Sequence, residues 1–176
     1  MLKNLSIHKL GSIGEILPDS VKLIKDLNQL KHNFPVFDVI ISVDNELYVM
    51  SIKARKKFGK NGKFNSQYNI LTGSNKRARK FKLALDLLIK FGYDIEKLNF
   101  GFIVAPFEEN RDVIYYMGLL SDVNPLFSVS NCLNDSCGNI YVPVKDENLM
   151  NYKILGIHTW NKIQNLILEK NKVSLV

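Results

Sequence analysis

The chain contains only two cysteines, Cys132 and Cys137, separated by four residues of a polar loop without a neighbouring histidine. A structural zinc site needs about four ligands, so two free thiols in a reducing compartment are favoured over a metal site or a disulfide. No run approaches the roughly 20 apolar residues that a membrane-spanning helix needs, and no apolar signal region follows Met1. We therefore expect a cytoplasmic protein that does not bind membranes.

Several motifs of nucleotide-binding enzymes are also missing. The sequence has no Walker loop, no Gly-x-Gly-x-x-Gly, no internal repeat and no low-complexity tract, and its three histidines are scattered. With 176 residues, of which 46% are hydrophobic, the chain can bury one core but is short for two. We expect a single domain over residues 1–176.

Acidic residues are absent between Leu47 and Leu85, and a dense basic stretch occupies this range. It holds eleven cations, more than the net charge of +7: Lys53, Arg55, Lys56, Lys57, Lys60, Lys63, Lys76, Arg77, Arg79, Lys80 and Lys82. A polyanion such as a nucleic acid is the natural partner, because each phosphate that is neutralised releases counterions. The alternative is a basic surface without a partner. The interleaved aromatic residues could stack on bases or anchor the loop: Phe58, Phe64, Tyr68 and Phe81.

Hydrophobic spacing predicts an α/β order of elements. A first helix is expected within residues 11–30, two strands at 36–43 and 46–53, a basic loop at 54–74, and a helix at 75–91 that ends at Gly92. A buried strand follows at 100–105, further strands at 112–120 (or a helix) and 140–144, and a closing helix at 154–168. We expect a mixed central β-sheet flanked by helices.

The turn dipeptide Asp44-Asn45 sets the register of the predicted hairpin. A two-residue turn carries Asp38 opposite Ser51, with Cβ atoms about 5 Å apart, and Lys53 points to the same side. An aspartate in an otherwise apolar strand is costly unless it is paired or binds a cation. Two interpretations stay open: a buried Asp38–Lys53 ion pair that fixes the register, and a functional site.

The segments Phe37-Asp38-Val39-Ile40-Ile41 and Leu47-Tyr48-Val49-Met50-Ser51-Ile52-Lys53-Ala54-Arg55, preceded by Gly14-Glu15-Ile16-Leu17, carry a family resemblance. Together they resemble the core of the PD-(D/E)XK superfamily of restriction-endonuclease-like nucleases, over residues 11–92. The resemblance implies that Asp38 binds a divalent metal, normally Mg²⁺ with Mn²⁺ as a substitute. It also implies that Lys53 orients or activates the attacking water, and that Glu15 is the assisting acid of the first helix.

The chain departs from the family at Ser51, where the motif has Asp or Glu. A hydroxyl supplies one neutral oxygen, so a hard cation would be held more weakly. Glu15 would compensate if it projects into the site as a second carboxylate and metal ligand. Its alternative role is a capping box with Ser12. The expected catalytic set is therefore Asp38, Lys53, Glu15 and Ser51.

We expect the substrate to contact the basic stretch and the residues that follow it. These residues are Arg55, Lys56, Lys57, Lys60, Lys63, Gln67, Tyr68, Lys76, Arg77, Arg79 and Lys80. For Gln67 and Tyr68, anchoring of the loop is the alternative role.

The leading hypothesis is a metal-dependent nuclease that hydrolyses phosphodiester bonds of DNA, with RNA and a homodimer left open. The alternatives are a non-catalytic nucleic-acid-binding module with a degenerate nuclease site, and a scaffold or inhibitor domain that binds an acidic protein. Metal binding at Asp38 separates the first from the others. Salt-dependent affinity for nucleic acid separates the second from the third.

Overall fold

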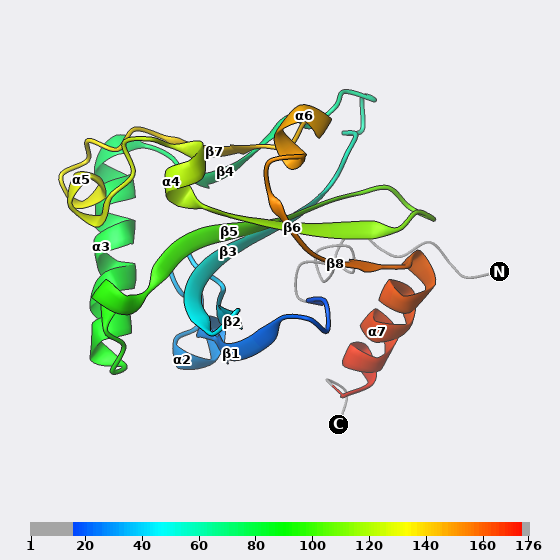
Figure 1. The fold of residues 1–176 in the computed structure, drawn as a ribbon, viewed down its shortest axis with the longest axis horizontal. Coiled ribbons are helices and arrows are strands. Elements are labelled where there is room, and N and C mark those ends of the chain that lie inside the picture. The colour runs from blue at the N-terminus through cyan, green and yellow to red at the C-terminus, as the bar shows by residue number, and fades with distance from the viewer. Residues whose placement is uncertain (1–15, 174–176) are drawn as a thin grey trace.

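A curled, mixed β-sheet forms the centre of the fold in the computed structural model, which describes residues 16–173 (Figure 1). Its strand order is β1-β2-β3-β5-β6-β8. The bounds are β1 (Lys22–Asp26), β2 (Val39–Val43), β3 (Glu46–Lys56), β5 (Asn99–Phe107), β6 (Val113–Leu119) and β8 (Lys153–His158). A separate antiparallel pair joins β4 (Gln67–Leu71) to β7 (Ile140–Pro143).

Helices cover both faces of the main sheet. The long ones are α3 (Ser74–Lys90) and α7 (Trp160–Val173), and the short ones are α2 (Leu27–Leu30), η2 (Ile95–Lys97), α4 (Leu120–Val123), α5 (Val129–Leu133) and α6 (Asp146–Leu149). Ile40 and Val49 pack in one core with α3, whereas Ile41 and Met50 pack in a second core with α7. Neighbouring strand residues thus alternate between the two cores. This confirms the predicted mixed sheet flanked by helices.

The β2–β3 hairpin has the predicted register. Val43 pairs with Glu46, and the ladder continues to Val39 opposite Met50. Asp44 and Asn45 have φ of 51° and 65°, which fits the left-handed positions of a tight hairpin turn. The two turn residues were therefore sufficient to predict the register of β2 against β3.

The segment after the hairpin also follows the prediction. Helix α3 begins one residue before the expected start and ends before Gly92, whose φ is +91°. It leads into β5, which runs parallel to β3 and has an almost entirely buried apolar sequence. A strand covered on both faces explains the uninterrupted hydrophobic run.

The expected helix within residues 11–30 is wrong over Lys22–Asp26, which form the strand β1. This strand pairs antiparallel with β2, from Lys22 opposite Ser42 to Asp26 opposite Val39. Ile24, counted as part of the apolar helix stripe, is 38% exposed. Backbone pairing with β2 therefore overrides the helical spacing, and the helix is reduced to α2. Residues 11–15 lie outside the described part of the chain.

Two other expectations need correction. The predicted closing helix at 154–168 is a strand over its first part, because β8 pairs with β6 before α7 begins at Trp160. The predicted loop at 54–74 contains the end of β3, a bridge between Phe58 and Phe64, and β4. The strand β8 pairs with β6, and β4 pairs with β7, so each pairs with a strand that is distant in the sequence. Hydrophobic spacing within one segment does not indicate such a partner.

We predict that Gly101→Ala destabilises the fold, because the sheet leaves no room for a Cβ there. An added Cβ would meet the Gly118 carbonyl oxygen and would lie 2.8 Å from Met50 Sδ. We expect a loss of roughly 1–3 kcal/mol in the free energy of unfolding by urea denaturation. Gly59→Ala is the control, since its nearest neighbour is the Asn61 side chain at 3.3 Å. Equal stability of the two variants would contradict this packing.

Candidate functional site

Asp38 lies one residue before β2, where three strands come together. Its N–H donates to Met50 O at 2.9 Å, and its Oδ2 accepts from the Ile52 N–H at 2.6 Å. Its carbonyl oxygen accepts from the Leu27 N–H at 2.9 Å, at the end of β1. Asp38 therefore forms hydrogen bonds to the backbone of Met50 and Ile52, on either side of Ser51. These bonds hold its carboxylate against the backbone of β3.

Asp38 and Lys53 influence each other's charge without direct contact. Burial raises the pKa of Asp38, and the Ile52 N–H and the Lys53 ammonium lower it by less. Burial likewise lowers the pKa of Lys53, against the opposing effect of Asp38. Within residues 16–173 the two side chains form no direct ion pair. Of the two open interpretations, the direct Asp38–Lys53 ion pair is therefore not formed, and the Asp38 carboxylate accepts a hydrogen bond from the Ile52 backbone instead.

A second carboxylate, Asp26, shares a cavity of about 360 Å³ with Asp38. Asp26 ends β1 opposite Val39, its Oδ1 accepts from Asn28 N–H at 3.0 Å, and its charge raises the pKa of Asp38. Arg55 and Lys170 also line this cavity. Sequence reasoning missed Asp26 because it placed residues 11–30 in a helix. A third antiparallel strand beside β2 would have placed it next to Asp38.

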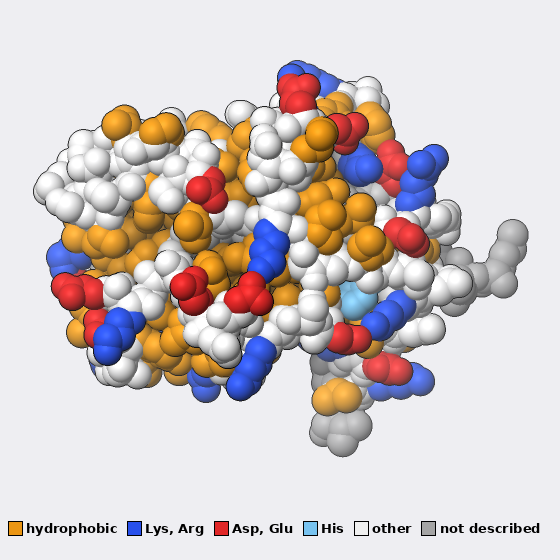
Figure 2. Space-filling model, viewed as in Figure 1, with side chains coloured by type: hydrophobic (Ala, Val, Ile, Leu, Met, Phe, Trp, Pro, Cys, Tyr) orange, Lys and Arg blue, Asp and Glu red, His pale blue; other side chains and the backbone are white. Residues whose placement is uncertain are grey.

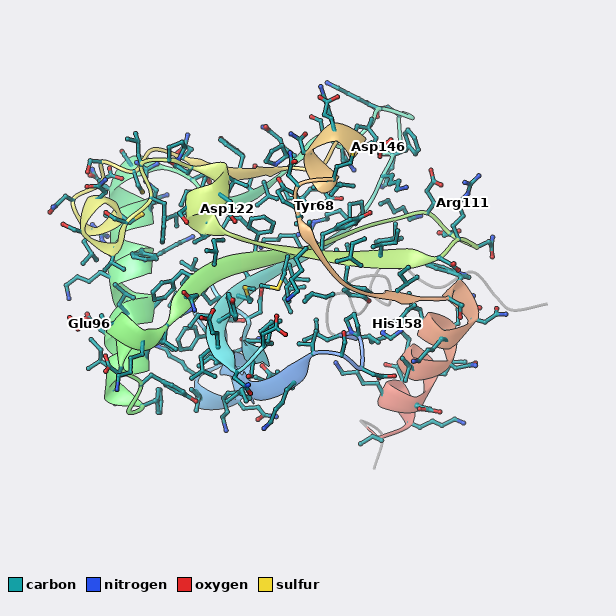
Figure 3. All side chains as sticks on the ribbon, in the orientation of Figure 1. Tyr68, Glu96, Arg111, Asp122, Asp146 and His158 are labelled. Carbon is teal, nitrogen blue, oxygen red and sulfur yellow. The ribbon has the colours of Figure 1, made fainter. Side chains whose placement is uncertain are left out.

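Lys53 and Arg55 line a smaller cavity of about 260 Å³ together with Gln67 and Tyr68. Tyr68 is buried, its hydroxyl donates to Arg55 O at 3.5 Å, and burial raises its pKa to about 12. Figure 3 shows Tyr68 beside the main sheet, where β4 approaches it. Arg55 lines both cavities, so it connects the Asp38 side of the site with the Lys53 side.

Ser51 is fully buried, with 0% exposure, and it lines neither cavity. Its Oγ has no hydrogen-bond partner among the described residues. A hydroxyl in this position is poorly placed to replace the acidic residue of the family motif. Glu15, the other residue expected to assist, lies outside the described residues.

Of the nine expected substrate-contacting cations, Arg55 lines both cavities and Lys57 is half-buried, and the other seven divide into three groups. Lys56 pairs with Glu109 at 2.8 Å at the end of β3. Exposed cations remain on the segment after β3 and on α3: Lys60, Lys63, Lys76, Arg79 and Lys80. Arg77 differs from both groups, because it is 5% exposed, pairs with Asp135 and donates to Asn139 Oδ1 at 2.6 Å. It attaches α3 to the segment after α5 and is not displayed to a partner.

No family model and no curated protein matches the chain. No helix within residues 16–173 is long and apolar enough to cross a membrane. The same residues contain no group of three or more Asp, Glu, His or Cys side chains placed to hold a metal ion. The site must therefore be interpreted from its own geometry.

We predict that Asp38→Asn stabilises the fold near neutral pH. Burial holds the pKa of Asp38 above 3.8, so the folded state binds this proton more tightly than the unfolded chain. The ionised carboxylate therefore costs stability above its folded pKa, and the cost disappears as the pH falls through that pKa. Asparagine keeps an acceptor for the Ile52 N–H. We expect a higher melting temperature at about pH 7 and little difference at about pH 3.

Asp112→Asn is the matched control, because Asp112 is exposed and should show no such pH-dependent gain. A lower melting temperature for Asp38→Asn at neutral pH would show that its carboxylate stabilises the fold through contacts stronger than its burial cost.

Proposed function

We propose that the chain is a divalent-metal-dependent nuclease that hydrolyses phosphodiester bonds, with DNA as the first candidate substrate and RNA as the second. The observation that carries the proposal is the half-buried Asp38 carboxylate, which shares one cavity with Asp26 and lies within electrostatic reach of Lys53. Carboxylates beside cations, next to a basic surface, suit a negatively charged phosphate ester that is bound together with a metal ion.

The resemblance to PD-(D/E)XK nucleases supports the same function. The hairpin that begins after Asp38 and carries Lys53 is followed by β4 and then by the helix α3, and a helix after the hairpin is what the resemblance implies. The region expected to be the first helix differs, since its described part, residues 16–30, contains the strand β1 and only the short helix α2. We accordingly propose a restriction-endonuclease-like core with an added edge strand.

The carboxylates fit a hard cation such as Mg²⁺ or Mn²⁺. Mg²⁺ is usually held by one or two carboxylates together with substrate phosphates, and the cavity offers Asp38 and Asp26. Their mutual repulsion contributes to the raised pKa of Asp38, and a cation between them would offset it. We assign these two residues as ligands, keep Glu15 as a third from the resemblance, and leave the buried Ser51 out.

A bound cation would polarise the phosphate and lower the pKa of a nearby water. In hydrolysis the attacking water gives up a proton to solvent as its oxygen forms a bond to phosphorus, the ester P–O bond breaks, and the leaving oxygen takes up a proton. Lys53 supports this reaction because its half-buried ammonium stabilises negative charge on the phosphate, and its lowered pKa eases proton transfer. Arg55, which lines both cavities, would hold a neighbouring phosphate oxygen.

A non-catalytic nucleic-acid-binding module is the second candidate. Ser51 favours it, because this buried hydroxyl takes the place of an acidic residue in the family motif. Such a module would keep the basic surface and would bind nucleic acid without cutting it.

We predict that the full chain cleaves DNA or RNA when Mg²⁺ or Mn²⁺ is added. Asp38→Ala and Lys53→Ala should each lower the cleavage rate by a factor of about 100 or more, the usual contribution of a positioned catalytic group. Asp26→Asn should raise the Mg²⁺ concentration needed for half-maximal cleavage. Ser51→Ala is the matched control within the same hairpin and should cleave at close to the wild-type rate. The measurement is the cleavage of labelled oligonucleotides at several metal concentrations.

Binding without cleavage in either metal would exclude the nuclease and leave the non-catalytic module. Cleavage that survives Asp38→Ala would place the reaction elsewhere in the chain.

We also predict that the basic segment after β3 dominates the electrostatic part of binding. Replacing Lys56, Lys57, Lys60 and Lys63 by Ala should flatten the slope of log affinity against log salt, by about 0.9 for each phosphate of duplex DNA that the variant no longer neutralises. Replacing the exposed Lys90 and Lys97, at the far end of α3 and on η2, is the control. An unchanged slope in the four-lysine variant would show that the phosphates bind another surface.

A further inference from the structure

The segment Lys57–Asn65, which follows β3, forms a compact hairpin. Phe58 and Phe64 pair as an antiparallel bridge, Gly59 N–H donates to Lys63 O at 2.8 Å, and Asn65 N–H donates to Lys57 O at 2.8 Å. The turn closes at Gly62, whose φ is +71°. These bonds order the backbone of the hairpin.

The hairpin displays an aromatic pair that the core does not cover. Phe58 is 47% exposed and meets Phe64 edge to face, with ring centroids 5.7 Å apart. An ordered, half-exposed Phe that is supported from one side offers an apolar ring face to a ligand. Stacking on such a face is the usual way in which proteins bind unpaired bases.

Across from the aromatic pair lies α6, and a cavity of about 430 Å³ separates the two. This volume lies within the range of small-ligand sites. The cavity lining carries charges of both signs. It holds the carboxylates of Glu108, Asp146 and Glu147, of which Glu108 also pairs with Arg111 at 3.2 Å, and the lysines Lys57 and Lys145. Figure 3 shows Asp146 on the same side of β6 as Tyr68, and Figure 2 shows basic and acidic side chains side by side over α6.

The cavity and the exposed hairpin surface suit different parts of a nucleotide. The three carboxylates can accept hydrogen bonds from the amino groups of cytosine or adenine, and Lys57 and Lys145 offset part of their negative charge. Lys60 and Lys63 are exposed on the hairpin and can neutralise the phosphates on either side. The arrangement therefore suits a base inside the cavity and its backbone outside.

We propose that the Lys57–Asn65 hairpin and α6 form a clamp for one unstacked nucleobase that carries an exocyclic amino group, with its ring on Phe58. The proposal rests on the nucleic-acid substrate of the proposed function and narrows it to single-stranded or locally unpaired sites. A base within a duplex cannot enter, because both of its faces are already stacked.

The test measures binding of the full chain to fluorescent oligonucleotides in EDTA, which prevents cleavage. Wild type should bind single strands of dC or dA more tightly than dT, and more tightly than a matched duplex. Phe58→Ala should weaken single-strand binding about tenfold without changing the salt slope, because stacking releases no counterions. Phe91→Ala, which removes another exposed ring at the end of α3, is the matched control and should bind as wild type does.

The contribution of the α6 carboxylates to base preference is tested separately. Asp146→Ala should strengthen binding to every single strand, since it removes a negative charge. It should also reduce the protein's preference for dC over dT, because it removes an acceptor for the amino group of the base. A 2-aminopurine base should lose fluorescence on binding to wild type but not to Phe58→Ala.

The outcomes distinguish the clamp from the proposed function. Equal binding by Phe58→Ala and wild type, or no preference for dC and dA over dT, would overturn the clamp while metal-dependent cleavage still stood. Failure of wild type to bind any nucleic acid would overturn both.

Discussion

The hydrogen bond from Ile52 N–H to the Asp38 carboxylate is the contact on which the site depends. It forms where the β2–β3 ladder ends, so a side chain satisfies an amide that the strand backbone leaves free. The Asp38 carbonyl oxygen also accepts from Leu27, which joins β1 to the same point. A half-buried acid is thereby held at the junction of three strands, and any chemistry at this site starts from its fixed position.

Burial shifts the two main charges of the site in opposite directions. The pKa of Asp38 rises and that of Lys53 falls, because both charged forms lose solvation. Their mutual attraction offsets only part of this cost, and Asp26 adds to the strain on Asp38. A cation beside the carboxylates and a phosphate beside Lys53 and Arg55 would relieve it. Under the proposed function, these pKa shifts would favour a metal ion and a phosphate ester bound together.

The parts of the fold that depend on local chemistry could be predicted from the sequence. The Asp44-Asn45 turn set the hairpin register, and an apolar stripe that ends at Gly92 located α3. The strands β1 and β8 were missed because their pairing partners override local spacing. For the same reason the sequence did not show Asp26 beside Asp38, or the pairing of Arg77 with Asp135, 58 residues away. The residues of a candidate site could thus be named, but their second carboxylate required the tertiary structure.

The most direct test of the account is a crystal of the full chain soaked in Mn²⁺ and measured for anomalous scattering. We expect one strong peak within coordination distance of both the Asp38 and the Asp26 carboxylates, in the cavity that Arg55 and Lys170 line. The peak should be absent from crystals of Asp38→Ala. A crystal without a peak there, or with the metal bound only at the carboxylates of Glu108, Asp146 and Glu147, would contradict the assignment of this cavity as the metal site of a nuclease.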